Sequence, residues 1–189
     1  PLGENVVSGH AVALNIASIV FMLPLAIGLA ASTRIGNLLG EKRYIEARYS
    51  SMVSVSLCFI GALFNMTLLI TLGDKLISLY TTDILVYTIA SNLIIFAAIF
   101  QIPDGIGMGS LGALRGYKDT FMTMVFIIVA YWIFAIPFGY YLTYYGINQP
   151  MGESGMWISM IFGLVIFASL ITSRLRKVSS KALNLNYQS

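Results

Sequence analysis

The sequence predicts an all-α integral membrane protein with five transmembrane helices. The chain of 189 residues is 58% hydrophobic and only 10% charged, whereas a soluble domain carries about 25% charged residues. Five apolar stretches are each long enough to cross a bilayer. In lipid every backbone polar group must be paired within the protein, and a helix meets that requirement within one segment.

The five spans follow one another along the chain with short polar connections. We place them at residues 11–33, 51–72, 86–114, 121–145 and 156–173. The second is uninterrupted and typical, and the fifth is near the lower length limit for a span. Residues 1–173 are therefore assigned to the membrane helices, and residues 174–189 to a basic tail.

The positively charged residues predict the orientation of these spans. All except Lys75 follow spans one, three or five. They are Arg34, Lys42, Arg43, Arg48, Arg115, Lys118, Arg174, Arg176, Lys177 and Lys181. The positive-inside rule places such loops in the cytoplasm, so the N-terminus of the chain is expected outside and the C-terminus inside. Because the cations lie beside apolar runs, the net charge of +3 indicates contact with membrane lipid rather than nucleic acid.

The start of the chain suggests that a segment precedes it. The sequence begins at Pro1 without Met and shows no secretory signal. An exterior N-terminus followed by an odd number of spans is hard to insert without a preceding helix. We therefore expect this chain to be the C-terminal part of a longer protein.

Asp104 is the charge that lies inside an apolar span. An ionised carboxylate there costs roughly 2.5–3.5 kcal/mol on insertion scales, so such a residue usually faces a cavity, a partner or an ion path. Pro103 removes a helix hydrogen bond beside it. Backbone carbonyls that lose their hydrogen-bond donor at Pro103 can, together with the carboxylate, bind a hard cation. Asp104 is therefore a candidate site for Na⁺ or for a proton. The alternative is an Asp that a neighbouring helix neutralises, or that caps the break at Pro103.

A series of segments resembles, in order, the multidrug and toxic compound extrusion (MATE) transporters, in their NorM-like bacterial branch. The segments are His10-Ala-Val-Ala-Leu-Asn15, Phe21-Met-Leu-Pro24-Leu, Arg34-Ile-Gly36-Asn-Leu-Leu-Gly40, Gln101-Ile-Pro-Asp104, Leu114-Arg-Gly-Tyr-Lys-Asp119, Tyr131-Trp132, Pro137-Phe-Gly-Tyr140 and Gly152-Glu-Ser-Gly155-Met-Trp157. The resemblance implies helices 8–12 of a twelve-helix, two-lobe antiporter in the bacterial inner membrane. The first helix of the C-terminal lobe and the whole N-terminal lobe would lie outside the chain, as a partner of this part.

The resemblance also suggests which residues serve the transport site. Asp104 matches the coupling-cation carboxylate. Phe100 stands where members often carry Tyr, and it keeps a π face for an organic cation without the hydroxyl. Gln101 could donate to the carboxylate, contact substrate, or simply pack between helices. His10 and Asn15 are further candidates for the cavity, although a His at a helix end is often a cap, and Asn15 must find a partner.

Three prolines and one aspartate have expected structural roles. Pro24, Pro103 and Pro137 are candidate hinges, with static kinks as the alternative. Asp119 is expected to cap the helix that follows it. Apart from the coupling ion, no cofactor is expected.

The leading functional interpretation is a cation-coupled antiporter, using Na⁺ or H⁺, that exports organic cations and drugs. An enzyme is not expected, because the chain has a single His, no HExxH sequence and no paired Cys ligands. Two alternatives stay open. One is a lipid-linked saccharide flippase of the same superfamily, although its cavity would be expected to hold several basic groups. The other is a truncated membrane protein that does not transport.

Overall fold

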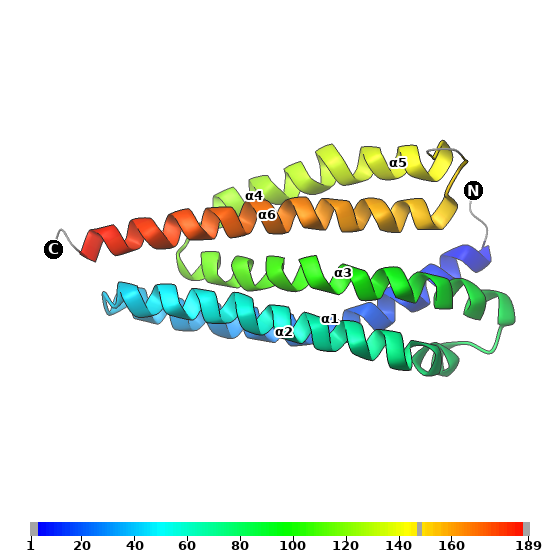
Figure 1. The fold of residues 1–189 in the computed structure, drawn as a ribbon, viewed down its shortest axis with the longest axis horizontal. Helices are drawn as coiled ribbons and strands as arrows, with labels where there is room; N and C mark the ends of the chain where they lie inside the picture. Colours follow the sequence, from blue (N-terminus) through cyan, green and yellow to red (C-terminus); the bar gives the residue numbers. More distant parts are fainter. Residues whose placement is uncertain (1–3, 147–148, 187–189) are drawn as a thin grey trace.

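The computed structural model describes residues 4–146 and 149–186, and these form a bundle of long helices (Figure 1). The helices are α1 (Glu4–Gly40), α2 (Tyr44–Tyr80), α3 (Ile84–Gly116), α4 (Thr120–Ile128), η1 (Val129–Ala135), α5 (Ile136–Tyr144) and α6 (Gly152–Asn186). Five helical segments, with α4, η1 and α5 counted together, are long and apolar enough to cross a membrane. The predicted fold class and its five spans are confirmed.

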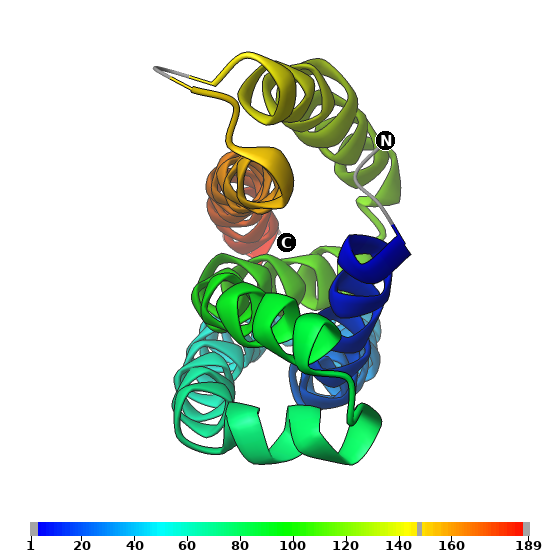
Figure 2. The same cartoon turned by 90° about the vertical axis from the view of Figure 1, so that its right-hand side faces the viewer.

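The helices form two groups, which the end view separates clearly (Figure 2). Helices α1, α2 and α3 pack against one another, and we call them the three-helix group. Helix α6 packs against η1 and α5 as well as against α3. We call α4, η1, α5 and α6 together the second group. Helix α3 is central because it contacts α1, α2 and α6 (Figure 1).

Glycines allow α3 to lie close to its neighbours. A Cβ at Gly112 would overlap the backbone of Gly28 in α1. A Cβ at Gly109 would lie 2.8 Å from the Cα of Val55 in α2, again a backbone atom that cannot turn aside. Small residues at such positions let membrane helices approach closely and gain van der Waals contact. The backbone of α3 is therefore fixed against both α1 and α2.

The connections place the basic residues together at one end of the bundle. The α1–α2 connection, the α3–α4 connection and the last turns of α6 share this end, and the other two connections lie at the opposite end (Figure 1). We call it the basic end; it carries Lys42, Arg43, Arg115, Lys118 and Arg176. The grouping of these charges agrees with the predicted topology, while the side of the membrane that they face stays a prediction.

The two short connections at the basic end use the same turn. Lys42 and Lys118 both have positive φ, 60° and 61°. The following amides close the helix ends, because Arg43 N–H donates to Leu38 O at 2.8 Å and Asp119 N–H to Leu114 O at 3.0 Å. This pattern satisfies carbonyls that a helix end leaves free. Both turns place a lysine where a glycine is more usual.

The fourth span contains a feature that the sequence analysis did not predict. Between α4 and α5 the chain forms seven residues of π-helix, Val129–Ala135, and the N–H of Ile136 donates to Tyr131 O five residues earlier. Pro137 follows directly, in the first turn of α5. Because proline has no N–H to donate, the helix before it must rearrange its hydrogen bonds. Such π turns are rare and often occur at functional sites.

The last helix does not end where the apolar run ends. Helix α6 continues through residues 174–186, so no break in the helix separates the membrane part from the basic tail. The division at residue 173 therefore stays a prediction. Residues 1–3 and 187–189, which belong to these two predicted parts, lie outside the described residues.

Candidate functional site

Asp104 lies in the C-terminal half of α3 with its side chain partly exposed. Within residues 4–146 and 149–186 its carboxylate has neither a hydrogen-bond partner nor an ion-pair partner. Tyr131 of η1 packs against the same buried cluster as Phe100 of α3. Phe100, one turn before Asp104 on the same helix face, meets Trp157 of α6 with ring centroids 6.2 Å apart. This face of α3 therefore looks toward η1 and α6.

Trp157 connects the first helix to this aromatic region. Its indole N–H donates to His10 Nδ1 at 3.2 Å, and the two rings meet edge to face with centroids 5.6 Å apart. Trp157 is only 1% exposed. Since Nδ1 accepts this bond, the neutral imidazole carries its proton on Nε2. His10 is thus held by a partner on another helix, and it lies in one aromatic group with Trp157 and Phe100.

Gln101 does not donate to Asp104. It is 1% exposed, and its Oε1 accepts a hydrogen bond from Asn65 Nδ2 of α2 at 3.3 Å. Asn65 Nδ2 also donates to Val20 O of α1 at 2.7 Å. The Nε2 of Gln101 has no partner among the described residues. Gln101 therefore belongs to a polar contact among α1, α2 and α3, directed away from the Asp104 face.

Asn15 finds its partner locally. Its side chain is exposed, and Nδ2 donates to Ala11 O of the same helix at 2.9 Å. An amide bonded in this way is not held by another helix. Asn15 is thus separate from the group formed by His10, Trp157 and Phe100.

The three prolines occupy different positions in their helices. Pro24 and Pro103 lie inside α1 and α3, and both are buried. The Pro24 carbonyl accepts a hydrogen bond from the thiol of Cys58 at 3.6 Å, so the lone cysteine packs between helices. Pro137 is the second residue of α5, in the first turn after the π-helix. A hinge role for any of the three stays a prediction.

The expected capping role of Asp119 is wrong. Asp119 is the N-cap residue of α4, but its side chain makes no capping hydrogen bond. Its Oδ2 instead accepts a hydrogen bond from Arg174 Nε of α6 at 2.6 Å. The cationic donor competes successfully for the carboxylate, because charge-assisted bonds are about twice as strong as neutral ones. A carboxylate that does cap is Asp83, which accepts from the N–H of Leu85 at 2.8 Å.

Sequence analysis missed the roles of Asn65, Trp157 and Tyr131 in these contacts between helices. The sequence could have indicated a hydrogen bond at Asn65, because a buried amide in an apolar span must find a hydrogen-bond partner. Trp157 and Tyr131 were noted only within segments of the family resemblance. Their contacts depend on how α6 and η1 pack against α3, which local sequence does not specify.

The fold and this site define a multi-pass α-helical membrane protein with polar groups buried among its spans. Comparison with known proteins identifies the family. The family model described as MatE matches residues 1–141. The chain belongs to the MatE family of multidrug and toxic compound extrusion transporters, and it is not an enzyme.

Curated relatives agree with this assignment. The multidrug resistance protein NorM of Vibrio vulnificus (strain YJ016) is 41% identical over 191 residues, covering 100% of this chain and 42% of the relative. The multidrug resistance protein PmpM of Pseudomonas aeruginosa is 36% identical over 177 residues, covering 93% of this chain and 37% of the relative. The chain thus spans about two fifths of the length of these relatives.

Two solved structures share the fold. The eukaryotic MATE transporter AtDTX14 matches with a TM-score of 0.84 and 22% identity, over 94% of this chain and 40% of that one. An outward-facing multidrug resistance MATE family transporter of the MOP superfamily matches with a TM-score of 0.86 and 17% identity, over 96% and 40%. At these identities the likeness shows the fold alone.

Proposed function

We propose that this chain is part of a cation-coupled antiporter that exports organic cations and drugs. Na⁺ or a proton binds at Asp104, and the basic end faces the cytoplasm of a bacterial plasma membrane. The chain works together with the segments that its relatives carry beyond the matched part. The names of NorM and PmpM, both described as multidrug resistance proteins, support the substrate class.

The observation that carries this proposal is the state of the Asp104 carboxylate. It lies within a helix long enough to cross the bilayer, and no described residue forms an ion pair with it. An ionised carboxylate in this environment needs a counter-charge, and a small cation or a proton supplies one. Because Pro103 has no N–H, a carbonyl one turn earlier in α3 lacks its usual donor and faces no competition for a cation.

Tyr131 supports the same site from the opposite side. Phe100 offers no hydroxyl, but the π-helix carries Tyr131, whose ring packs against the same buried cluster as Phe100. We propose that Tyr131 contributes an oxygen to the bound cation, and that the aromatic rings of Phe100 and Trp157 face the organic substrate. Filling the cation site would then favour the conformation that releases substrate outside.

The test is ethidium efflux from cells that express the membrane protein containing this chain, with Asp104→Asn and wild type compared at equal membrane abundance. We expect efflux to fall at least about tenfold, because an amide cannot neutralise a cation. Asp74→Asn is the matched control, since Asp74 is an exposed carboxylate that accepts a hydrogen bond from Ser91 at 2.7 Å. That control should keep most of the efflux.

Unchanged efflux in Asp104→Asn would contradict the role of Asp104. Tyr131→Phe sharpens the test, because it should raise the cation concentration needed for half-maximal transport while leaving the membrane abundance unchanged. Imposed Na⁺ and H⁺ gradients in proteoliposomes then distinguish the two coupling ions. Absence of efflux from wild type would favour the flippase or the non-transporting alternative.

A further inference from the structure

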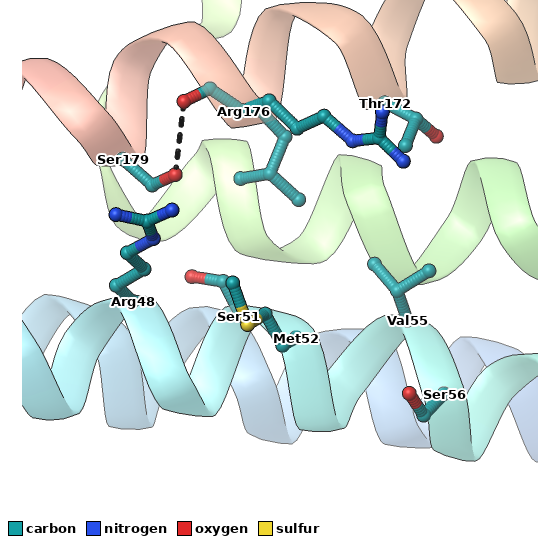
Figure 3. Close-up of a pocket in the computed structure, with 9 residues that line it drawn as sticks. Arg48, Ser51, Met52, Val55, Ser56, Thr172, Arg176 and Ser179 are labelled. Atoms are coloured by element: carbon teal, nitrogen blue, oxygen red, sulfur yellow. Dashed lines mark hydrogen bonds between the residues drawn. The ribbon is translucent and has the colours of Figure 1, made fainter.

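A cleft opens between α2 and α6 at the basic end, with a volume of about 270 Å³ (Figure 3). Arg48, Ser51 and Val55 line it from α2, and Thr172, Arg176 and Ser179 line it from α6. The two arginines come from the two opposing helices, and the side chain of Arg48 points across the cleft toward α6 (Figure 3). The Arg176 side chain extends along α6 toward Thr172, so a negatively charged group in the cleft would have Arg48 on one side and Arg176 on the other (Figure 3).

The two arginines of the cleft lack the partners that neighbouring arginines have. Arg43 forms ion pairs with Glu41 and Glu46, and Arg174 pairs with Asp119. Arg48 and Arg176 form no ion pair within the part of the chain that the structure describes. No carboxylate lines the cleft. Its charge is therefore positive and uncompensated, which suits an anionic ligand.

The cleft continues into an apolar groove. Thr172 and Arg176 also line a second hollow of about 470 Å³, which runs between α3 and α6 past Pro103, Ile106, Val165 and Ala168. Together the two hollows form a basic cleft at the end of the bundle that continues as an apolar groove toward the middle of the bundle. A ligand that fits both must carry an anionic head and a hydrocarbon chain.

We infer that the cleft and the groove together bind one anionic phospholipid. Its phosphate lies between Arg48 and Arg176, and one acyl chain runs along Ile106 and Val165. Guanidinium groups form bidentate hydrogen bonds with phosphate, and basic pockets between transmembrane helices are known to hold anionic head groups. The lipid would bridge α2 to α6 across the face of α3.

This lipid site is separate from Asp104. Ile106 comes two residues after Asp104, which is about 200° around an α-helix. Ile106 therefore lies on the opposite face of α3 from the carboxylate, and Pro103, at the near edge of the groove, is about 100° away from it. Lipid binding can be tested without reference to transport, so failure of one proposal leaves the other intact.

The experiment is native mass spectrometry of the purified membrane protein that contains this chain, titrated with dioleoyl-phosphatidylglycerol. The variant Arg48→Gln/Arg176→Gln should bind this lipid at least about tenfold more weakly, since both charge-assisted contacts are lost. The matched control is Arg115→Gln/Lys177→Gln, which removes the same charge at the basic end from residues that do not line the cleft. This control should bind within about twofold of wild type.

A second variant tests the contribution of the apolar groove to lipid binding. Ser169 is exposed and lines the groove, and its hydroxyl donates to Val165 O of its own helix. Ser169→Trp should therefore fold normally, fill the groove and weaken lipid binding by roughly the same tenfold, since its ring occupies the place of the chain.

Three results would overturn the proposal. Equal weakening in the control pair would mean a general attraction to basic residues. Equal binding of dioleoyl-phosphatidylcholine would mean that the charge of the head group does not matter. Displacement of the lipid by glycerol 3-phosphate at the same concentration would mean that the cleft binds a free phosphate and that the groove contributes nothing.

Discussion

The contact of α1 with α3 at Gly112 and the contact of α5 with α6 at Gly139 leave different room for an added side chain. In the three-helix group, backbone meets backbone, as at Gly28 and Gly112, and a side chain has no room to enter. Where α5 meets α6 both kinds of neighbour occur: a Cβ at Gly155 would lie 2.8 Å from the backbone of Leu142, whereas a Cβ at Gly139 would first meet the hydroxyl of Ser159. Ser159 can turn aside, whereas a backbone cannot. The contact at Gly112 is therefore fixed, while the contact at Gly139 can adjust.

The largest expected effect comes from forcing a side chain into the fixed contact. Gly112→Val should destabilise the protein by about 3 kcal/mol or more, because neither helix can relax without moving its backbone. Gly139→Ala, in the adjustable contact, should cost about 1 kcal/mol. The measurement is the melting temperature in detergent.

Gly40→Ala is the control for both glycine variants, since no atom lies within 4 Å of the added Cβ. Equal losses in Gly112→Val and Gly139→Ala would remove the distinction between the fixed and the adjustable contact.

The ion pair between Asp119 and Arg174 gives the next largest effect. It joins the start of α4 to α6 at 2.6 Å, and the side chains are 15% and 35% exposed, respectively. Asp119→Asn should cost about 1 kcal/mol, in the upper part of the range for ion pairs near water. A double-mutant cycle with Arg174→Gln isolates the pair. A coupling near zero would show that side-chain packing alone holds α4 against α6.

Within the three-helix group the polar contact of Asn65 contributes less. Asn65→Leu should cost about 0.6 kcal/mol, the average for hydrogen bonds between membrane helices. Gln101→Leu should be neutral or slightly stabilising, because Nε2 of Gln101 has no partner in the part of the chain that the structure describes. Both are measured by thermal unfolding in the same detergent. A loss above 2 kcal/mol from Gln101→Leu would mean that the amide has a further partner.

The smallest expected effect lies in the two turns at the basic end. Lys42→Gly and Lys118→Gly should each stabilise the protein by about 0.5 kcal/mol, since glycine adopts positive φ without strain. One turn lies within the three-helix group and the other joins the two groups. Equal gains in thermal stability are expected because the strain is local. A gain at only one lysine would show that its turn also constrains the packing of the groups.

Much of the architecture could be predicted from the sequence because lipid imposes few choices. The lengths of the apolar stretches predicted the five spans. Nearly all the basic residues follow every second span, which predicted that they share one end of the bundle. Asp104 was recognisable from the cost of a charge in hydrocarbon. Its surroundings were not, because Trp157 reaches His10 across 147 positions of the chain, and such pairing depends on helix packing. Gln101 shows the same limit, since helical spacing placed it near Asp104 while Asn65 holds its carbonyl oxygen.

The π-helix in the fourth span has a consequence for comparing this chain with its relatives. A π turn accommodates one residue more than the α-helix it interrupts, so α4 and α5 do not share one regular helical repeat. Removing a single residue within Val129–Ala135 could restore an ordinary helix while both flanks keep their neighbours. Relatives can therefore differ by one residue here and still present matching faces on either side. A one-residue gap in a sequence alignment of this family would belong at this position.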